Sequence, residues 1–273
     1  DVVRVHQAYI DMKHFPDASV SMRIGRQELK YGREALVGAD DWDLDGRSFD
    51  AIRLFTNNPL WNVDAFYSLV ADTPGVHHKI HFEGLNLKRT SLMKTVNEVY
   101  GFYLSIPPNV SLVDNTRATE SKLYTIGTRM EGKLNPKWFY HWMLNRQVGR
   151  MTMPTTPETR VDIDAYNALL NLDYFVGHTV LRNAGFEVTI STGDKAYTPT
   201  KMETFSPLFP SNHDRSGAMD WWGMMNSRIL TLYTFLDLSR TLEMLMEFHS
   251  FAIKSNGAAW YLGDMSPAWF SGA

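Results

Sequence analysis

The residues with the clearest chemical meaning are arginines that stand inside segments of alternating polarity. Arg23 and Arg53 have apolar residues on both sides, and Arg129 stands between Thr128 and Met130. The guanidinium group stays protonated at any physiological pH and pairs with a carboxylate through two parallel hydrogen bonds. These residues therefore predict the binding or steering of anions rather than covalent catalysis.

The strands that carry these arginines expose one apolar and one polar face. In the segment 20–25, Val20, Met22 and Ile24 point to one side, while Arg23 points to the other. An unpaired charge is costly inside a soluble core. A sheet with an apolar outside and a wet inside is typical of an outer-membrane β-barrel.

The composition restricts the remaining possibilities. The chain has 273 residues, 44% hydrophobic and 21% charged, with a net charge of -3. This near-neutral balance gives no reason to expect a nucleic-acid partner. Because cysteine is absent, disulfides, zinc–thiolate sites and a cysteine nucleophile are excluded. No apolar run reaches the roughly 20 residues that a spanning helix needs.

Segments of period two follow one another along the whole chain. We count about eleven or twelve strands of about 9–14 residues, long enough to cross a bilayer when tilted. Short turns alternate with longer polar connections at 32–46, 73–97 and 193–223. The pattern predicts an all-β protein, a transmembrane antiparallel up-and-down β-barrel, built as a single domain over residues 1–273.

Acidic residues are expected among the arginines, so a second interpretation stays open. The alternation places several carboxylates on the inner face: Glu28, Asp64, Glu131, Asp162 and Glu187. Arg26 and Asp50 are also expected to pair across neighbouring strands. Glu28 and Asp50 are therefore candidate structural ion-pair partners, and each arginine is either a pore-lining group or one half of an internal ion pair.

Four stretches resemble the alginate-export family of outer-membrane porins. They are RIGRQELKYG, DWDLDGRSFDAIRL, the STGD at 191–194 and TFSPLFPSNHDRSGAMDWWGMMNSRIL at 204–230. The resemblance implies a barrel that is 18-stranded in the characterised porin. Fewer strands are readable here, and no closing strand ends in an aromatic residue, so we expect several strands to be missing.

The resemblance also implies a conduction pathway lined by basic residues that attract polyuronate carboxylates. The resemblance assigns this role to Arg26, Arg47 and Arg53, whereas Arg23 and Arg129 are added from alternation alone. Rings of basic side chains select anions in pores.

The resulting hypothesis is a passive outer-membrane channel, surrounded by lipid, for anionic solutes such as uronate polysaccharides or oligosaccharides. It requires no catalytic step and no cofactor. One alternative is a scaffold barrel that docks another envelope protein. A second alternative is a soluble β-rich protein that binds or degrades polysaccharide. The chain opens at Asp1 without signal-peptide features, so either an export signal was removed before this form or the protein was never exported.

Metal binding is not expected. Asp41, Asp43 and Asp45 resemble the start of a calcium loop, but Ile52 stands where such a loop needs a bidentate acid. The pair at 77–78 forms a histidine cluster without a carboxylate partner.

Overall fold

A long run of antiparallel strands forms the molecule, as a computed structural model shows. The structure describes residues 5–15, 19–42, 46–56, 58–70, 80–91, 94–107, 120–152, 159–177, 180–195, 201–211, 222–256, 259–262 and 267–268. The strands are β1 (Ala8–Lys13), β2 (Val20–Gln27), β3 (Phe49–Thr56), β4 (Trp61–Val70), β5 (His81–Thr90), β6 (Val96–Ile106), β7 (Ser121–Asn135), β8 (Trp138–Thr152), β9 (Arg160–Phe175), β10 (Leu181–Ser191), β11 (Lys201–Met202), β12 (Ser227–Asp237), β13 (Glu243–Ile253), β14 (Trp260–Tyr261) and β15 (Pro267–Ala268).

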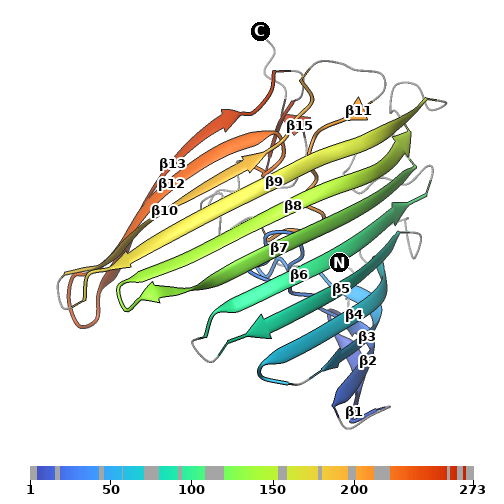
Figure 1. The fold of residues 1–273 in the computed structure, drawn as a ribbon, viewed down its shortest axis with the longest axis horizontal. Coiled ribbons are helices and arrows are strands. Elements are labelled where there is room, and N and C mark those ends of the chain that lie inside the picture. The colour runs from blue at the N-terminus through green and yellow to red at the C-terminus, as the bar shows by residue number, and fades with distance from the viewer. Residues whose placement is uncertain are drawn as a thin grey trace.

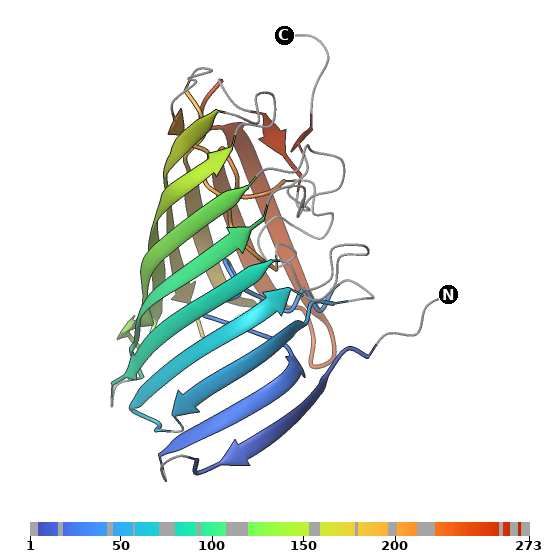
Figure 2. The ribbon, with the colours of Figure 1, turned by 90° about the vertical axis from the view of Figure 1, so that its right-hand side faces the viewer.

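The topology is up-and-down. Strands β1 to β10, β12 and β13 pair in chain order within one thirteen-stranded sheet, and the short β11 runs parallel to β9 at the side. The sheet is strongly tilted and curved but does not close, so β1 and β13 remain its two edges (Figures 1 and 2). The described residues contain no helix, so the prediction of an all-β, antiparallel up-and-down fold is confirmed.

The two faces of the sheet have the inverted polarity that the sequence predicts. Large apolar side chains are exposed on the outer face, including Ile126 at 62% and Leu144 at 52%. Polar side chains are buried on the inner face, including Gln147 at 0% and Asn167 at 1%. Because successive strand residues alternate between the faces, each strand presents apolar side chains to the lipid outside and polar side chains to the interior.

Two sequence predictions are wrong in detail. The segment 73–97, predicted to be a polar connection, contains β5, whose charged residues obscure the alternation of inner Phe82 with outer Leu85. Asp162 lies on the outer face, because its neighbours Val161 and Ile163 point inward and are buried. Apolar residues thus occupy part of the inner face, which reverses the expected assignment at this end of β9.

Connections of two lengths distinguish the two rims of the sheet. The six connections after β1, β3, β5, β7, β9 and β12 span two to six residues, whereas the connections after β2, β4, β6, β8 and β10 are longer. We call these edges the short-connection rim and the long-connection rim. In outer-membrane barrels the short turns are periplasmic and the long loops extracellular.

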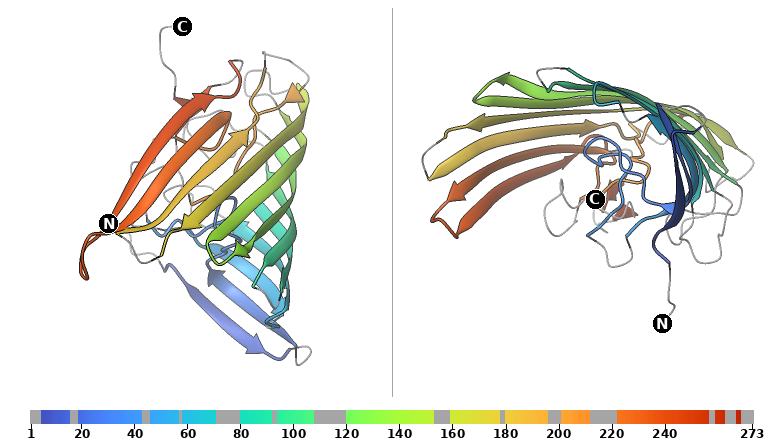
Figure 3. Two further views of the ribbon diagram at one scale, coloured as in Figure 1. Left: turned by 60° about the vertical axis from the view of Figure 1, so that its left-hand side comes forward. Right: turned by 90° about the horizontal axis from the view of Figure 1, so that it is seen from below.

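Two segments from the long-connection rim fold back against the concave face. They are residues 28–42 with 46–48, and residues 201–211; Figure 3, right, shows both inside the curve of the sheet. A backbone bridge joins Val37 to Phe209, which packs edge-on against Phe49 and Phe82. The apolar core therefore lies inside the curve, under the long-connection rim, and leaves the other end of the interior polar.

Candidate functional site

A polar cavity of about 370 Å³ lies inside the sheet near the short-connection rim. Strands β3 to β7 form its wall, and the inward-folded segment supplies Lys30, Tyr31 and Gly32. Its ionisable side chains other than Tyr31 are Lys30, Arg53, Asp64, Lys88, Glu98 and Arg129. Neighbouring strands are paired so that Asn62, Lys88, Glu98 and Arg129 stand in one row.

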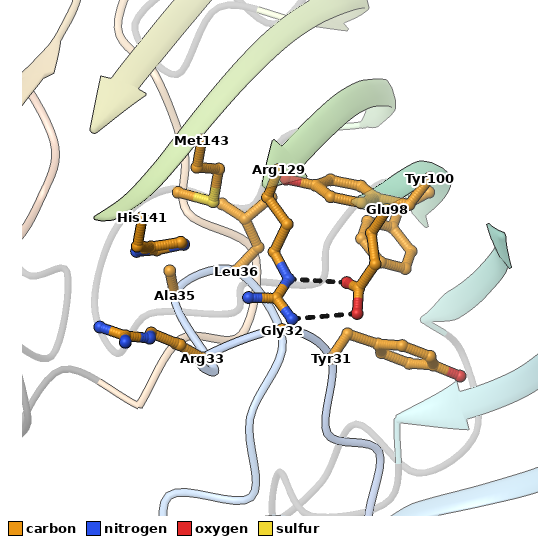
Figure 4. Close-up of a pocket in the computed structure, with 11 residues that line it drawn as sticks. Tyr31, Gly32, Arg33, Ala35, Leu36, Glu98, Tyr100, Arg129, His141 and Met143 are labelled. Carbon is orange, nitrogen blue, oxygen red and sulfur yellow. Dashed lines mark hydrogen bonds and ion pairs between the residues drawn. The ribbon is translucent and has the colours of Figure 1, made fainter. Parts of the chain in front are cut away.

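The most deeply buried charges of this site belong to Arg129 and Glu98. Arg129 donates from Nε and Nη2 to the two carboxylate oxygens of Glu98, at 2.8 and 3.0 Å (Figure 4). Both side chains are about 95% buried, and Arg129 Nη1 lies 3.0 Å from Glu131. Gly32 sits so close that a Cβ there would be 3.0 Å from Arg129 Nε, at a positive φ of 61°. Only glycine allows the loop to cover this pair without displacement.

A second ion pair joins β3 to β4. Arg53 Nε lies 3.0 Å from both carboxylate oxygens of Asp64, and its Nη2 also donates to this carboxylate. The Tyr31 hydroxyl donates to Asp64 at 3.1 Å. Burial raises the pKa of Tyr31 well above its usual value, so this hydroxyl stays protonated and remains a donor. The loop is thereby held against the ion pair.

Two lysines complete the basic lining. Lys30 contacts Glu28 at 3.0 Å and Asp41 at 2.5 Å, and the hydrogen bond with Asp41 raises its pKa. Lys88 points inward from β5, and no carboxylate of the described residues is recorded within 4.0 Å of its ammonium group. Lys88 is thus the cation of this cavity that is most available to a passing anion.

Arg23 also lies on the inner face, but at the open edge of the sheet. It donates to both oxygens of Asp11 on β1, at 2.6 and 2.8 Å, and stacks 3.8 Å from the centre of the Tyr9 ring. It stands next to Arg53 in the strand register, outside the cavity lining.

Arg26 is not a lumen residue, which corrects its prediction as one. It shares the outer face with Met22 and Ile24 because two and four residues separate them along β2. Its guanidinium donates to both oxygens of Asp50, at 2.8 and 2.9 Å. The expected cross-strand pair of Arg26 and Asp50 therefore exists, on the lipid-facing side of the sheet.

Arg47 connects the two inward-folded segments instead of facing the cavity. It donates to Asp40 and to the Pro210 carbonyl, both at 3.0 Å, and to the Gly38 carbonyl at 3.3 Å. Glu28 accepts from Gln7 at 2.7 Å and lies 2.9 Å from His6 Nε2. Arg47 and Glu28 fix loops to each other and to the chain before β1.

The inner wall of the later strands is built mainly from neutral polar groups, with Asp173 of β9 as a buried carboxylate that accepts from Tyr233 at 2.6 Å. Tyr100 donates to Asn145, Asn145 donates to Asn167, and Asn167 donates to Ser191, at 2.7, 3.0 and 2.9 Å. This row, which we call the amide ladder, crosses from β6 to β10. Gly127 of β7 makes room for it, because a Cβ there would overlap the Tyr100 ring.

The STGD stretch is a structural turn after β10. The Asp194 carboxylate accepts from the Glu203 backbone amide and from the Thr204 hydroxyl at 3.1 Å. The Ser255 hydroxyl donates to the backbone carbonyl of Asp194 at 2.6 Å. Burial raises the pKa of Asp194. The motif thus attaches the segment 201–211 to the rim.

Sequence reasoning missed three members of the cavity. Lys88 was hidden in the unrecognised strand β5, and Glu98 precedes the point where the β6 pattern becomes regular. Lys30 lies in a loop, where periodicity gives no direction. Only Glu98 left a usable signal, since it is a carboxylate on the strand next to Arg129.

The described residues contain no group of three or more histidine, aspartate or glutamate side chains able to hold a metal ion. Asp43, Asp45 and both residues of the 77–78 histidine pair lie outside the described residues. Within the described part, no helix is long and apolar enough to span a membrane.

The apolar outer face, the charged interior and the up-and-down strand order define an outer-membrane β-barrel of the channel class. The sequence comparison then gives the particular family. The model of the alginate export family matches residues 1–273, and the chain belongs to this family. No curated protein matches the chain. The family is one of transport porins, which points to the outer membrane as location and to an anionic polysaccharide as the transported class.

Proposed function

We propose that the protein is a passive, anion-selective channel whose selectivity resides in the polar cavity near the short-connection rim. The carrying observation is the charge of the cavity lining. Four basic residues and two acidic residues line it, a formal surplus of two positive charges (4 − 2). Basic groups in a confined space raise the local concentration of anions.

The arrangement of the charges supports this proposal. Asp64 and Glu98 are each held by an arginine, so neither carboxylate presents a free negative face to the cavity. Arg53 and Arg129 are preorganised by these contacts, while Lys88 supplies a mobile ammonium group. The carboxylates of a uronate chain would then bind in turn to the fixed guanidinium groups and to the flexible ammonium group of Lys88. Each contact is weak enough to be released, so the chain is bound but can still move through the cavity.

The pathway under the long-connection rim is narrowed by the two inward-folded segments, whose apolar residues pack against the inner wall. This packing favours one alternative, a scaffold barrel with a filled lumen that docks an envelope protein. The exposed apolar outer face disfavours the other alternative, a soluble β-rich protein, because monomeric soluble proteins expose only small apolar patches.

Planar-bilayer recording of the purified protein tests the proposal. We expect ion conduction with anion preference, and block by uronate oligomers. The double variant Arg53→Gln with Lys88→Gln should lose the preference, since it removes two positive charges from the lining. A cation-selective wild type contradicts the proposed mechanism, and a wild type without conductance supports the scaffold alternative.

A further inference from the structure

A group of basic side chains stands on the outer face at the long-connection rim of β7, β8, β9 and β11. Its five members are Lys122, Arg146, Arg150, Arg160 and Lys201, and we call them the basic rim cluster. The strand register places Lys122, Arg150 and Lys201 in one row across the sheet, with Asp162 between the last two. None of these residues lines the cavity.

The cluster begins where the apolar band of the outer face ends. Exposed Tyr124 and Tyr166 stand beside it, and exposed Ile126 and Leu144 lie further along the same strands. At the opposite end of the band, Trp138 packs against Tyr174 in a tilted arrangement with ring centres 4.9 Å apart. Aromatic side chains of this kind favour the interface between hydrocarbon and headgroups.

The spacing agrees with the thickness of a membrane. Trp138 and Arg146 are eight positions apart on β8 (146 − 138), which corresponds to about 26 Å along a strand at roughly 3.3 Å per residue. At a tilt of about 40° this becomes about 20 Å along the membrane normal, close to the height of the apolar band of outer-membrane barrels. The residues beyond Arg146 therefore lie at headgroup depth.

The charges of the cluster are both in surplus and accessible. Among the described residues, its five bases stand beside three acids, Glu120, Asp162 and Asp164, which leaves two positive charges (5 − 3). Arg150 is 76% exposed and lies 3.0 Å from Asp162, whereas Arg160 is 72% exposed and lies 3.7 Å from Glu120. Exposed ion pairs of this type contribute little to stability. Their guanidinium groups can therefore turn to another anion at small cost.

We propose that the basic rim cluster binds the phosphate groups of anionic lipid in the leaflet that surrounds the long-connection rim. A phosphate accepts two parallel hydrogen bonds from a guanidinium, which suits Arg150 and Arg160. The cluster continues directly into an exposed apolar band, and only a ligand with both acyl chains and phosphate complements the two surfaces together. The proposal rests on the membrane setting of the proposed function but not on conduction through the lumen.

Binding of a bisphosphorylated lipid A to the full chain in detergent micelles, followed by native mass spectrometry, tests this proposal. The variant Arg150→Gln with Arg160→Gln should bind about tenfold more weakly, since each basic group near a lipid surface strengthens binding severalfold. The matched control is Arg89→Gln with Lys137→Gln, which removes two exposed charges at the short-connection rim. The control should bind like the wild type.

Two further ligands separate the binding of lipid phosphate from the binding of acyl chains or of free phosphate. The same lipid without its phosphates should bind the wild type and the Arg150/Arg160 variant equally. Inorganic phosphate alone should produce no adduct that depends on Arg150 and Arg160; such an adduct would assign the cluster to free phosphate and overturn the proposal.

The proposal would also be overturned if the control variant bound lipid A as weakly as the Arg150/Arg160 variant, or if neither variant bound it more weakly than the wild type. Bilayer conductance and anion preference should be unchanged in the cluster variant, which keeps this result independent of the lumen.

Discussion

The inner wall has two halves, which use different chemistry to provide buried polar side chains with hydrogen-bond partners. Strands β3 to β7 place full charges inside the sheet and pair them, as in Arg53 with Asp64 and Arg129 with Glu98. Strands β8 to β10 with β12 place mainly amides and hydroxyls there, as in the amide ladder, and hold the buried carboxylate of Asp173 by hydrogen bonds from Tyr233 and Asn183. Both halves give most of their buried polar groups a hydrogen-bond partner, and unpaired buried polar groups destabilise a fold.

The difference teaches where the channel can be selective. A neutral amide gives shape and hydration but no preference for either sign of ion. A charged wall produces a potential that acts over several ångströms, even when each carboxylate is already paired. We therefore assign selectivity to the charged half and a mainly structural role to the amide half. The following predictions test this division.

The largest effect on stability is expected for Glu98→Gln. The substitution leaves the guanidinium of Arg129 about 95% buried without its main counter-charge. Breaking a buried ion pair in this way costs about 3–5 kcal/mol of unfolding free energy. Urea titration of the protein in lipid vesicles measures this loss.

A double variant distinguishes the effect of the two charges from the effect of the side-chain volume that the pair fills. The double change Glu98→Leu with Arg129→Met should recover most of the stability, because it removes both charges and retains apolar volume. If Glu98→Gln alone costs less than about 1 kcal/mol, the charged half is not held by this pair.

A smaller loss is expected when the amide ladder is broken at its centre. Asn167, which is 1% exposed, accepts from Asn145 and donates to Ser191, so Asn167→Leu leaves both neighbours unsatisfied. The expected cost is about 1–3 kcal/mol, measured in the same urea titration. Anion preference should stay unchanged, and a shift in selectivity would contradict the division between the halves.

Lys88→Gln should change selectivity without changing stability. At about 8 Å in water-like surroundings, one charge contributes about 0.5 kcal/mol to the energy of a passing ion. Removing the charge weakens attraction of the anion and repulsion of the cation by this amount each, so the ratio of anion to cation permeability, obtained from reversal potentials across a salt gradient, should fall about sixfold. Lys195→Gln provides a matched control, since this exposed lysine is not part of the cavity lining. An equal fall in the control would assign the effect to general surface charge.

Much of this fold can be read from the sequence, because outer-membrane strands follow period two with few exceptions. Alternation alone places Arg53 and Arg129 correctly on the inner face. It misses strand β5, and Lys88 with it, because the charged outer residues of β5 mask the pattern. Arg47 lies in a loop, where its contacts depend on Pro210, 163 positions away. Such long-range loop contacts leave no local pattern that a sequence can reveal.

The smallest effect is expected for Arg26→Gln. An unchanged anion preference in this variant would show that selectivity depends on residues of the inner face. Arg26 lies in the motif that the family resemblance associates with conduction, yet its strand parity places it outside the sheet beside Ile24. Arg26 stands next to the last residue of β2, at the long-connection rim, where the effect of a charge on the lipid face falls to about 0–1 kcal/mol, so loss of its pair with Asp50 should cost at most about 1 kcal/mol. Reversal potentials should equal those of the wild type, whereas Arg53→Gln, also on a strand of the charged half, should shift them. A shift from Arg26→Gln as large as that from Arg53→Gln would mean that selectivity follows the motif and not the face of the sheet.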